Sequence, residues 1–256
     1  NSAVYFNARH LDGLDAATTG FELWDAKRKN SFTIQYKMMY RKDSTDLTYL
    51  VNPNDWGVGK FNNTMLLSYE HPYNYYRGNG NIKMNLSTSV IGSDYDYHSL
   101  SINVVNKNDL GKININTRTF AQIGTGTNWA SESMLYGAGA NPESLMDNKY
   151  TRSVAIFPDN WGGYGADINH FQAGGGLNMR GYAGYLMSQL DKTGGVRNTY
   201  KGTTGYAENI ELEFQELFSF IGRIAPKLNS IIGLKTYLFG DIGAINFNLP
   251  NESFAM

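Results

Sequence analysis

The chain has 256 residues and a formal net charge of −1, which fits one domain or one large barrel. The balanced charge, without a Lys/Arg cluster, gives no sign of nucleic-acid binding. Cysteine is absent, which excludes disulfides and cysteine metal sites. Gly (28), Tyr (18) and Phe (13) are abundant, Pro (6) is scarce and only 41% of residues are apolar, a mix that favours strands and turns over helices.

Two classes of β protein fit this composition. One is a soluble sandwich or barrel. The other is a transmembrane β-barrel, whose strands are apolar only on the lipid side. No window reaches the roughly 18 continuous apolar residues of a membrane helix. The first residues, NSAVY, lack the basic region and apolar core of a signal peptide. Because they already read as strand, we expect a mature chain or a fragment of a longer polypeptide.

The first strands are expected at residues 4–11 and 20–24, around the turn signal Asp12-Gly13. Residues 31–41 show the clearest alternation, with Met39 as the one exception. Their apolar face carries Phe32, Ile34, Tyr36, Met38 and Tyr40. Period two over about ten residues has the length and pattern of a membrane-spanning strand, whereas strands of soluble proteins average about five or six.

A polar loop is expected at residues 42–60, followed by a strand at 63–71 and a tyrosine-rich turn at 73–78. Tyrosines at the end of a strand suit an interfacial aromatic belt, because the ring is apolar and the hydroxyl is wet. A solvent-facing tyrosine patch explains them equally well.

Residues 81–91, 99–105 and 112–124 alternate in the same way, with an apolar face opposite a face rich in Asn, Ser, Thr and Lys. The turn at 106–111 has the composition of a tight hairpin. These segments predict an up-and-down antiparallel meander. A polar interior suits a water-filled lumen better than a small soluble core.

Regularity ends between about residues 125 and 205, where Gly, Asn, Ser, Trp and Pro dominate. An irregular connection of that length is usually functional. Within it we expect a short strand at 152–157 and an inward-folded loop in 171–185. Strands return at 207–218 and 232–247, which brings the expected number to about nine.

No constellation indicates catalysis. The four histidines lack metal-site spacing, residues 137–141 lack the Lys-Ser/Thr of a phosphate loop, and there is no Gly-x-Ser-x-Gly elbow. Glu211 and Glu213 share one face of a strand, where a charged pair facing a lumen is a better interpretation than acid/base chemistry. We therefore expect no catalytic site, metal or cofactor in this chain.

A glycine-rich stretch carries the strongest functional signal. Its members are Gly174, Gly175, Gly176, Leu177, Asn178, Met179, Arg180, Gly181 and Tyr182. If this loop enters a lumen, Arg180 can meet Glu213 and Asp241, which lie on the inward faces of the next two strands, and charge-assisted bonds would pin the loop. The alternative is three unrelated surface charges.

This pattern resembles the C-terminal barrel of the bacterial surface-antigen superfamily, which includes the BamA-like and TamA-like proteins. The matching blocks are the Arg-Gly-Tyr loop, residues 208–214 and residues 237–243. The resemblance implies a transmembrane antiparallel barrel of about 16 strands, of which this chain (residues 1–256, one barrel domain) holds part. It also implies a structural lock formed by Arg180, Glu213 and Asp241. Further strands and the soluble POTRA modules of that family are absent from these residues.

The resemblance implies a place in the bacterial outer membrane, in contact with lipid and lipopolysaccharide. It also implies a role in inserting or translocating proteins, with client polypeptides and accessory assembly subunits as partners. A second hypothesis makes the barrel the anchor or export domain of a fused hydrolase, aminopeptidase-like or patatin-like, whose catalytic domain lies outside this chain. A third is a passive pore or a soluble β-sandwich binding module. Dependence on detergent separates the sandwich from the barrels.

Overall fold

The protein is described by a computed structural model that covers residues 1–11, 14–26, 29–42, 57–130, 133–136, 177, 179, 187–190, 196–199, 201–214 and 236–246. Within these ranges the elements are strands, without an α-helix. The all-β expectation is therefore confirmed. Residues 152–157, where a short strand is expected, lie outside the described ranges.

Nine strands form one antiparallel sheet in the order β1-β2-β3-β4-β5-β6-β7-β12-β13. They are β1 (Ser2–Leu11), β2 (Leu14–Trp24), β3 (Ser31–Arg41), β4 (Phe61–Tyr75), β5 (Gly78–Ser89), β6 (Asp96–Asp109), β7 (Ile113–Asn128), β12 (Thr204–Phe214) and β13 (Thr236–Asn246). From β1 to β7 each strand pairs with the next one along the chain, which confirms the meander, and β7 then pairs with β12. Two small pairs lie outside the main sheet: β8 (Leu135–Tyr136) with β11 (Lys201–Gly202), and β9 (Met187–Leu190) with β10 (Val196–Thr199).

Several strands are longer than the sequence predicts. β2 begins at Leu14 rather than at Gly20, because the small residues Ala16 and Ala17 hide the alternation. β4 runs on to Tyr75, so most of the expected tyrosine-rich turn is strand. The chain reverses between Tyr75 and Gly78. The nine sheet strands are 10 to 16 residues long.

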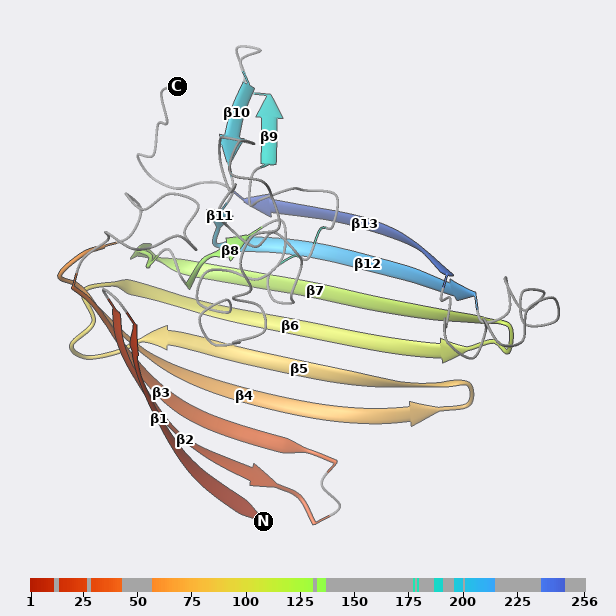
Figure 1. Cartoon of the computed structure of the whole chain (residues 1–256), viewed down its shortest axis with the longest axis horizontal. Coiled ribbons are helices and arrows are strands. Elements are labelled where there is room, and N and C mark those ends of the chain that lie inside the picture. Colours follow the sequence, from red (N-terminus) through yellow and green to blue (C-terminus); the bar gives the residue numbers. More distant parts are fainter. Residues whose placement is uncertain are drawn as a thin grey trace, which may run out of the picture.

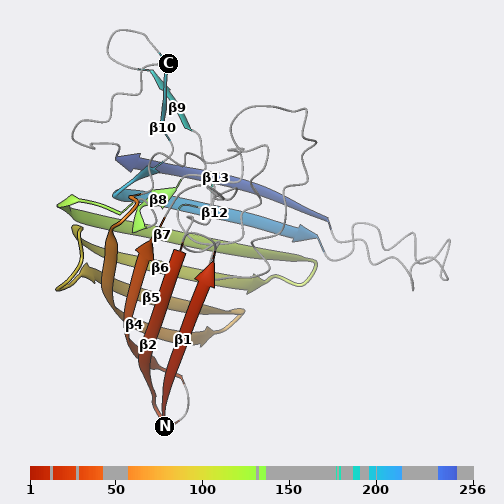
Figure 2. The same cartoon turned by 60° about the vertical axis from the view of Figure 1, so that its left-hand side comes forward.

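The sheet is curled and twisted, as Figures 1 and 2 show, and it is open in the described part of the chain, with β1 and β13 at its edges. Right-handed strand twist makes such curling the rule in large sheets. The first and last strands of the described sheet, β1 and β13, are therefore its two edge strands.

The register aligns like side chains across the sheet. One face, called the outer face, carries an apolar row through seven strands: Val4, Phe21, Ile34, Leu67, Leu86, Leu100 and Ile123. The opposite, inner face carries a polar row through five strands: Asn7, Thr18, Lys37, Thr64 and Ser89. A slip of one residue in any pair would exchange the two faces.

Burial runs opposite to that of a soluble sheet. Val4 on the outer face is 76% exposed, whereas Lys37 on the inner face is only 4% exposed. In soluble proteins lysine is mostly exposed. Met39, the exception to the alternation of β3, lies on the inner face and is fully buried there. In the middle of the sheet, polar Thr18, Lys37 and Thr64 are thus buried on the inner face, while apolar side chains are exposed on the outer face.

Three tyrosines lie across glycines of the adjacent strand. Tyr5 crosses Gly20 on β2 and donates to Gln35 Oε1 on β3 at 2.8 Å. On the outer face, two equivalent groups span β4, β5 and β6: Tyr73–Gly80–Asn106 and Tyr75–Gly78–Asn108. In all three groups the tyrosine, glycine and amide residue occupy one register row. Each group therefore ties three strands in a single register.

Replacing the glycine of such a group is expected to destabilise the folded protein. A Cβ at Gly80 would overlap the ring of Tyr73, so Gly80→Ala should displace the ring and cost about 1–3 kcal/mol of unfolding free energy. Urea unfolding monitored by tyrosine fluorescence measures this.

Gly240→Ala is the matched control, since nothing lies within 4 Å of a Cβ there. It should be neutral or slightly stabilising, because alanine restricts the unfolded chain. Equal losses at both glycines would contradict the interlocking role of the tyrosine.

Candidate functional site on the inner face

Two residues of the glycine-rich stretch lie on the inner face. Leu177 is fully buried and Met179 nearly so, in a cluster with Phe120 of β7, Leu135 of β8 and Ala207 of β12. Apolar packing of this kind fixes the position of the segment. These two residues thus lie on the inner face, while the rest of the expected inward-folded loop lies outside the described residues.

Two glycines of the sheet make room for this segment. A Cβ at Gly205 would lie 3.1 Å from Leu177 Cδ2, and one at Gly243 would lie 2.8 Å from Met179 Sδ. Glycine in a strand often marks such a close approach of another part of the chain. Gly205 and Gly243 therefore leave the space that the side chains of Leu177 and Met179 occupy, and we call these two positions their seats.

Arg118 of β7 holds the same segment by hydrogen bonds. Its Nη1 donates to the Leu177 carbonyl oxygen at 3.3 Å and to Asn209 Oδ1 at 2.9 Å. Asn209 Nδ2 donates in turn to Asp241 Oδ1 at 3.0 Å. Arg118, Asn209 and Asp241 occupy one register row of β7, β12 and β13. A charge-assisted chain thus links three strands to the loop.

Neither Arg118 nor Asn209 stands out in the sequence as a site residue. Arg118 stands in the asparagine-rich alternation of β7 and looks like an ordinary polar member of that face. The strand register shows their relation: when β7, β12 and β13 are paired, Arg118 and Asn209 lie in the same row as Asp241. The register of the paired strands, rather than the composition of each strand, identifies these two residues.

Of the predicted lock residues, the structure describes Glu213 and Asp241. Gly174, Gly175, Arg180, Gly181 and Tyr182 lie outside the described residues. The contact of Arg180 with the two carboxylates therefore stays a prediction.

Glu213 and Asp241 share the inner face, as expected, but they do not share a register row. Glu213 pairs with Tyr237, four residues before Asp241, and accepts a bond from Asn114 Nδ2 at 3.3 Å. Four residues of strand span about 13 Å. Glu211, which pairs with Phe239, lies between the two rows. It is therefore the glutamate nearer to Asp241.

A second segment is anchored on the inner face beyond the end of β7. Trp129 stacks on Tyr97, with ring centroids 4.8 Å apart, and Ala130 is buried beside them. The Tyr97 hydroxyl bonds to Asn62 Oδ1 at 3.0 Å and to Ser133 Oγ at 2.8 Å. Buried hydroxyl and amide groups need such partners. The chain that leaves β7 is therefore turned inward over the sheet.

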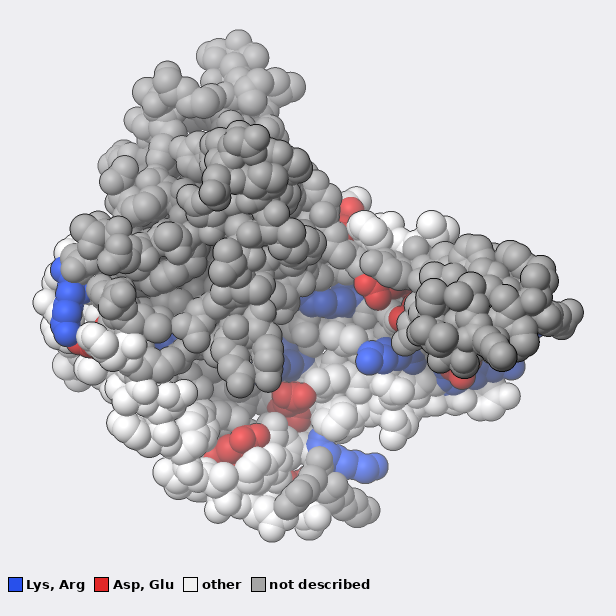
Figure 3. Space-filling model, viewed as in Figure 1, with Lys and Arg blue, Asp and Glu red and all other residues white. Residues whose placement is uncertain are grey.

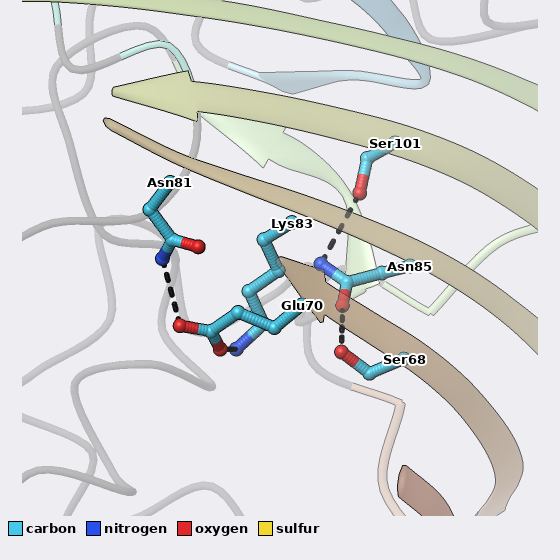
Figure 4. A network of polar contacts seen from close by, with 6 residues as sticks. All are labelled: Ser68, Glu70, Asn81, Lys83, Asn85 and Ser101. Carbon is cyan, nitrogen blue, oxygen red and sulfur yellow. Dashed lines mark hydrogen bonds and ion pairs between the residues drawn. The ribbon is translucent and has the colours of Figure 1, made fainter. Parts of the chain in front are cut away.

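A polar network covers the inner face of β4, β5 and β6 (Figure 4). Glu70 accepts from Asn81 Nδ2 at 2.7 Å and lies 3.9 Å from Lys83 Nζ. Asn85 accepts from Ser68 at 2.7 Å and donates to Ser101 at 3.5 Å. Two further oxygen atoms, Asn81 Oδ1 and Asn103 Oδ1, are buried and have no hydrogen-bond partner among the described residues. Such a surface is suited to hold water or a polar solute.

Charges of both signs lie together on the side of the molecule seen in Figure 3. In the described part of the chain, no group of three or more His, Asp or Glu residues could hold a metal ion. No helix among the described residues is long and apolar enough to cross a membrane. The arrangement has the chemistry of a hydrated polar surface with anchored loop segments.

Comparison with known proteins adds no relative: no family model matches the chain, and a search of curated proteins finds no match.

The chain of bonds through Arg118 should behave as one unit. Arg118→Gln should lower the unfolding free energy by about 1.5–3 kcal/mol, since hydrogen bonds of charged groups contribute that much. Asn209→Ala removes the middle of the same chain. The double variant should lose less than the sum of the two, with a coupling of about 0.5–3 kcal/mol in a urea-unfolding cycle.

Lys107→Gln is the matched control, because this inner-face cation of β6 makes no hydrogen bond within the described part of the chain. Its effect should stay within about 0.5 kcal/mol. Strictly additive losses for Arg118→Gln and Asn209→Ala would contradict the linked arrangement.

Proposed function

We propose that this chain forms part of the wall of a β-barrel in the bacterial outer membrane. The barrel is of the surface-antigen type and assists the insertion or translocation of proteins. The observation that carries the proposal is the inverted arrangement of the sheet. Apolar side chains such as Phe21, Ile34 and Leu86 are exposed on the outer face, whereas the polar side chains of Thr18, Lys37 and Thr64 lie on the inner face. A wall between lipid and a water-filled lumen requires this inversion.

The position of the apolar zone supports a membrane wall over a generic apolar surface. On β12, Ile210 and Leu212 face outward, in rows that hold Asn106 and Asn108 on β6. The apolar zone therefore crosses the register rows obliquely. Strands of a membrane barrel tilt by about 35–45°, so an apolar band level with the membrane has to cross the rows in this way.

The ends of the outer face support the same arrangement. Tyr69, Tyr73 and Tyr75 lie on the outer side of β4 towards its hairpin, and each hydroxyl bonds to an asparagine. Rings with satisfied hydroxyls fit the boundary between hydrocarbon and headgroups. Of the two interpretations of the tyrosines, the interfacial belt is the one that this proposal adopts.

Two features support a role in protein insertion or translocation. Leu177 and Met179, which adjoin the Arg-Gly-Tyr motif, lie on the inner face, the face on which the resemblance places the lock. The edge strands β1 and β13 each have one unpaired side in the described sheet. An unpaired edge offers backbone N–H and C=O groups to an incoming strand. A client protein that is folding supplies such strands.

An insertion assay tests the activity. Phospholipid vesicles that contain this chain receive a small, urea-unfolded outer-membrane barrel protein, and its folded fraction is followed by gel mobility without heating. We expect insertion severalfold faster than in empty vesicles, because the edges of the sheet template the first client strands.

Vesicles with an equal amount of a passive porin are the control for membrane disturbance. If the porin accelerates insertion as much as this chain does, the chain has no assisting activity and the proposal fails.

A further inference from the structure

A polar pocket lies at the ends of the β4–β5 and β6–β7 hairpins, away from the seats of Leu177 and Met179. Its volume is about 760 Å³. It is bordered by the turn at Tyr76 and Arg77, by β6 and β7, and by Glu213 of β12. Small-molecule pockets of this size are usually lined by apolar side chains. This one is lined by amides and charges, so a polar ligand fits it.

Three side chains in the pocket form a straight row. Asn79 pairs with Lys107, and Lys107 pairs with Asn116, on the inner face of β5, β6 and β7. None of the three makes a hydrogen bond or ion pair within the described part of the chain. Neighbouring strands are about 4.8 Å apart, so the row offers three polar groups over about 10 Å.

The pocket is balanced in charge. Two cations, Arg77 and Lys107, face two carboxylates, Asp109 and Glu213. A site for a phosphate or another strong anion would carry an excess of cations. The balance favours a neutral ligand whose groups both donate and accept hydrogen bonds, since carboxamides do both.

Tyr76 adds an aromatic face at the mouth of the pocket. Its side chain is 92% exposed, and the Arg77 guanidinium lies 5.5 Å from the ring centroid. The ring is thus open to solvent on nearly all sides. An open aromatic face packs against the C–H surface of a pyranose, while the amides reach the hydroxyls at its edge.

We infer that this pocket binds a neutral oligosaccharide. A pyranose chain repeats at about the spacing of the Asn79–Lys107–Asn116 row, one ring per strand. An extended peptide fits less well, because its amides recur every 3.3–3.4 Å or so and point alternately to opposite sides. The inference concerns the pocket alone and is independent of whether the outer face lies in lipid.

Isothermal titration calorimetry of the full chain tests the inference, in a zwitterionic detergent that carries no sugar. The probes are chitotetraose, cellotetraose and maltotetraose, with a blocked Gly-Ser tetrapeptide as the comparison. We expect at least one tetrasaccharide to bind with a Kd at or below about 1 mM. Its Kd should not change between low and high salt, because a neutral ligand is not screened.

Variants locate the binding. Asn79→Ala and Asn116→Ala should each weaken the bound tetrasaccharide about three- to tenfold, the loss of one hydrogen bond. Asn7→Ala is the matched control, because Asn7 is an exposed inner-face asparagine of β1, at the far edge of the sheet, and does not line the pocket. It should leave the Kd unchanged.

Three outcomes would overturn the inference: no tetrasaccharide binds, the tetrapeptide binds more tightly than all of them, or Asn7→Ala weakens binding as much as Asn79→Ala and Asn116→Ala. Correct folding of each variant is checked by its urea-unfolding midpoint. The insertion assay can fail while the oligosaccharide binds, and the reverse, so the two proposals are tested separately.

Discussion

The structure depends on one constraint: the register of nine antiparallel strands keeps the apolar row on the outer face and the polar row on the inner face. Because side chains alternate strictly along a strand, a slip of one residue would move Lys37 outward and Ile34 inward. The tyrosine–glycine–amide groups oppose such a slip, since each ties three strands at one row. The polar inner face, the seats for Leu177 and Met179 and the amide row at the hairpins all follow from that fixed register.

The inner face has two ends with different contents. Towards the long connections, Leu177, Met179 and Trp129 bring the chain back onto the sheet, and Arg118 bonds to the returning backbone. Towards the hairpins, Asn79, Lys107 and Asn116 line a pocket of about 760 Å³. The anchored segment and the polar pocket therefore lie on the same face of the sheet. A solute at the pocket meets carboxamides, which donate and accept hydrogen bonds, rather than an apolar core.

Sequence alone predicted the strands well where alternation was strong. Residues 31–41 were placed to the residue, and the shared face of Glu213 and Asp241 was correct. Alternation failed at Ala16 and Ala17, whose small side chains carry little polarity signal. The bonding of Arg118 to Asn209 was not predictable, because it arises from the alignment of β7 with β12 across about 90 residues of chain. The contact of Arg180 lies outside the described residues and stays a prediction.

The central claim is that the outer face meets lipid and the inner face meets water. Since the chain has no cysteine, single cysteines along β3 can each carry a nitroxide label in lipid vesicles. The account predicts that labels at Phe32, Ile34 and Tyr36 collide with dissolved oxygen, as in hydrocarbon. Labels at Thr33 and Gln35 should collide with a water-soluble nickel chelate instead. Equal access of the nickel chelate to all five positions would contradict the account.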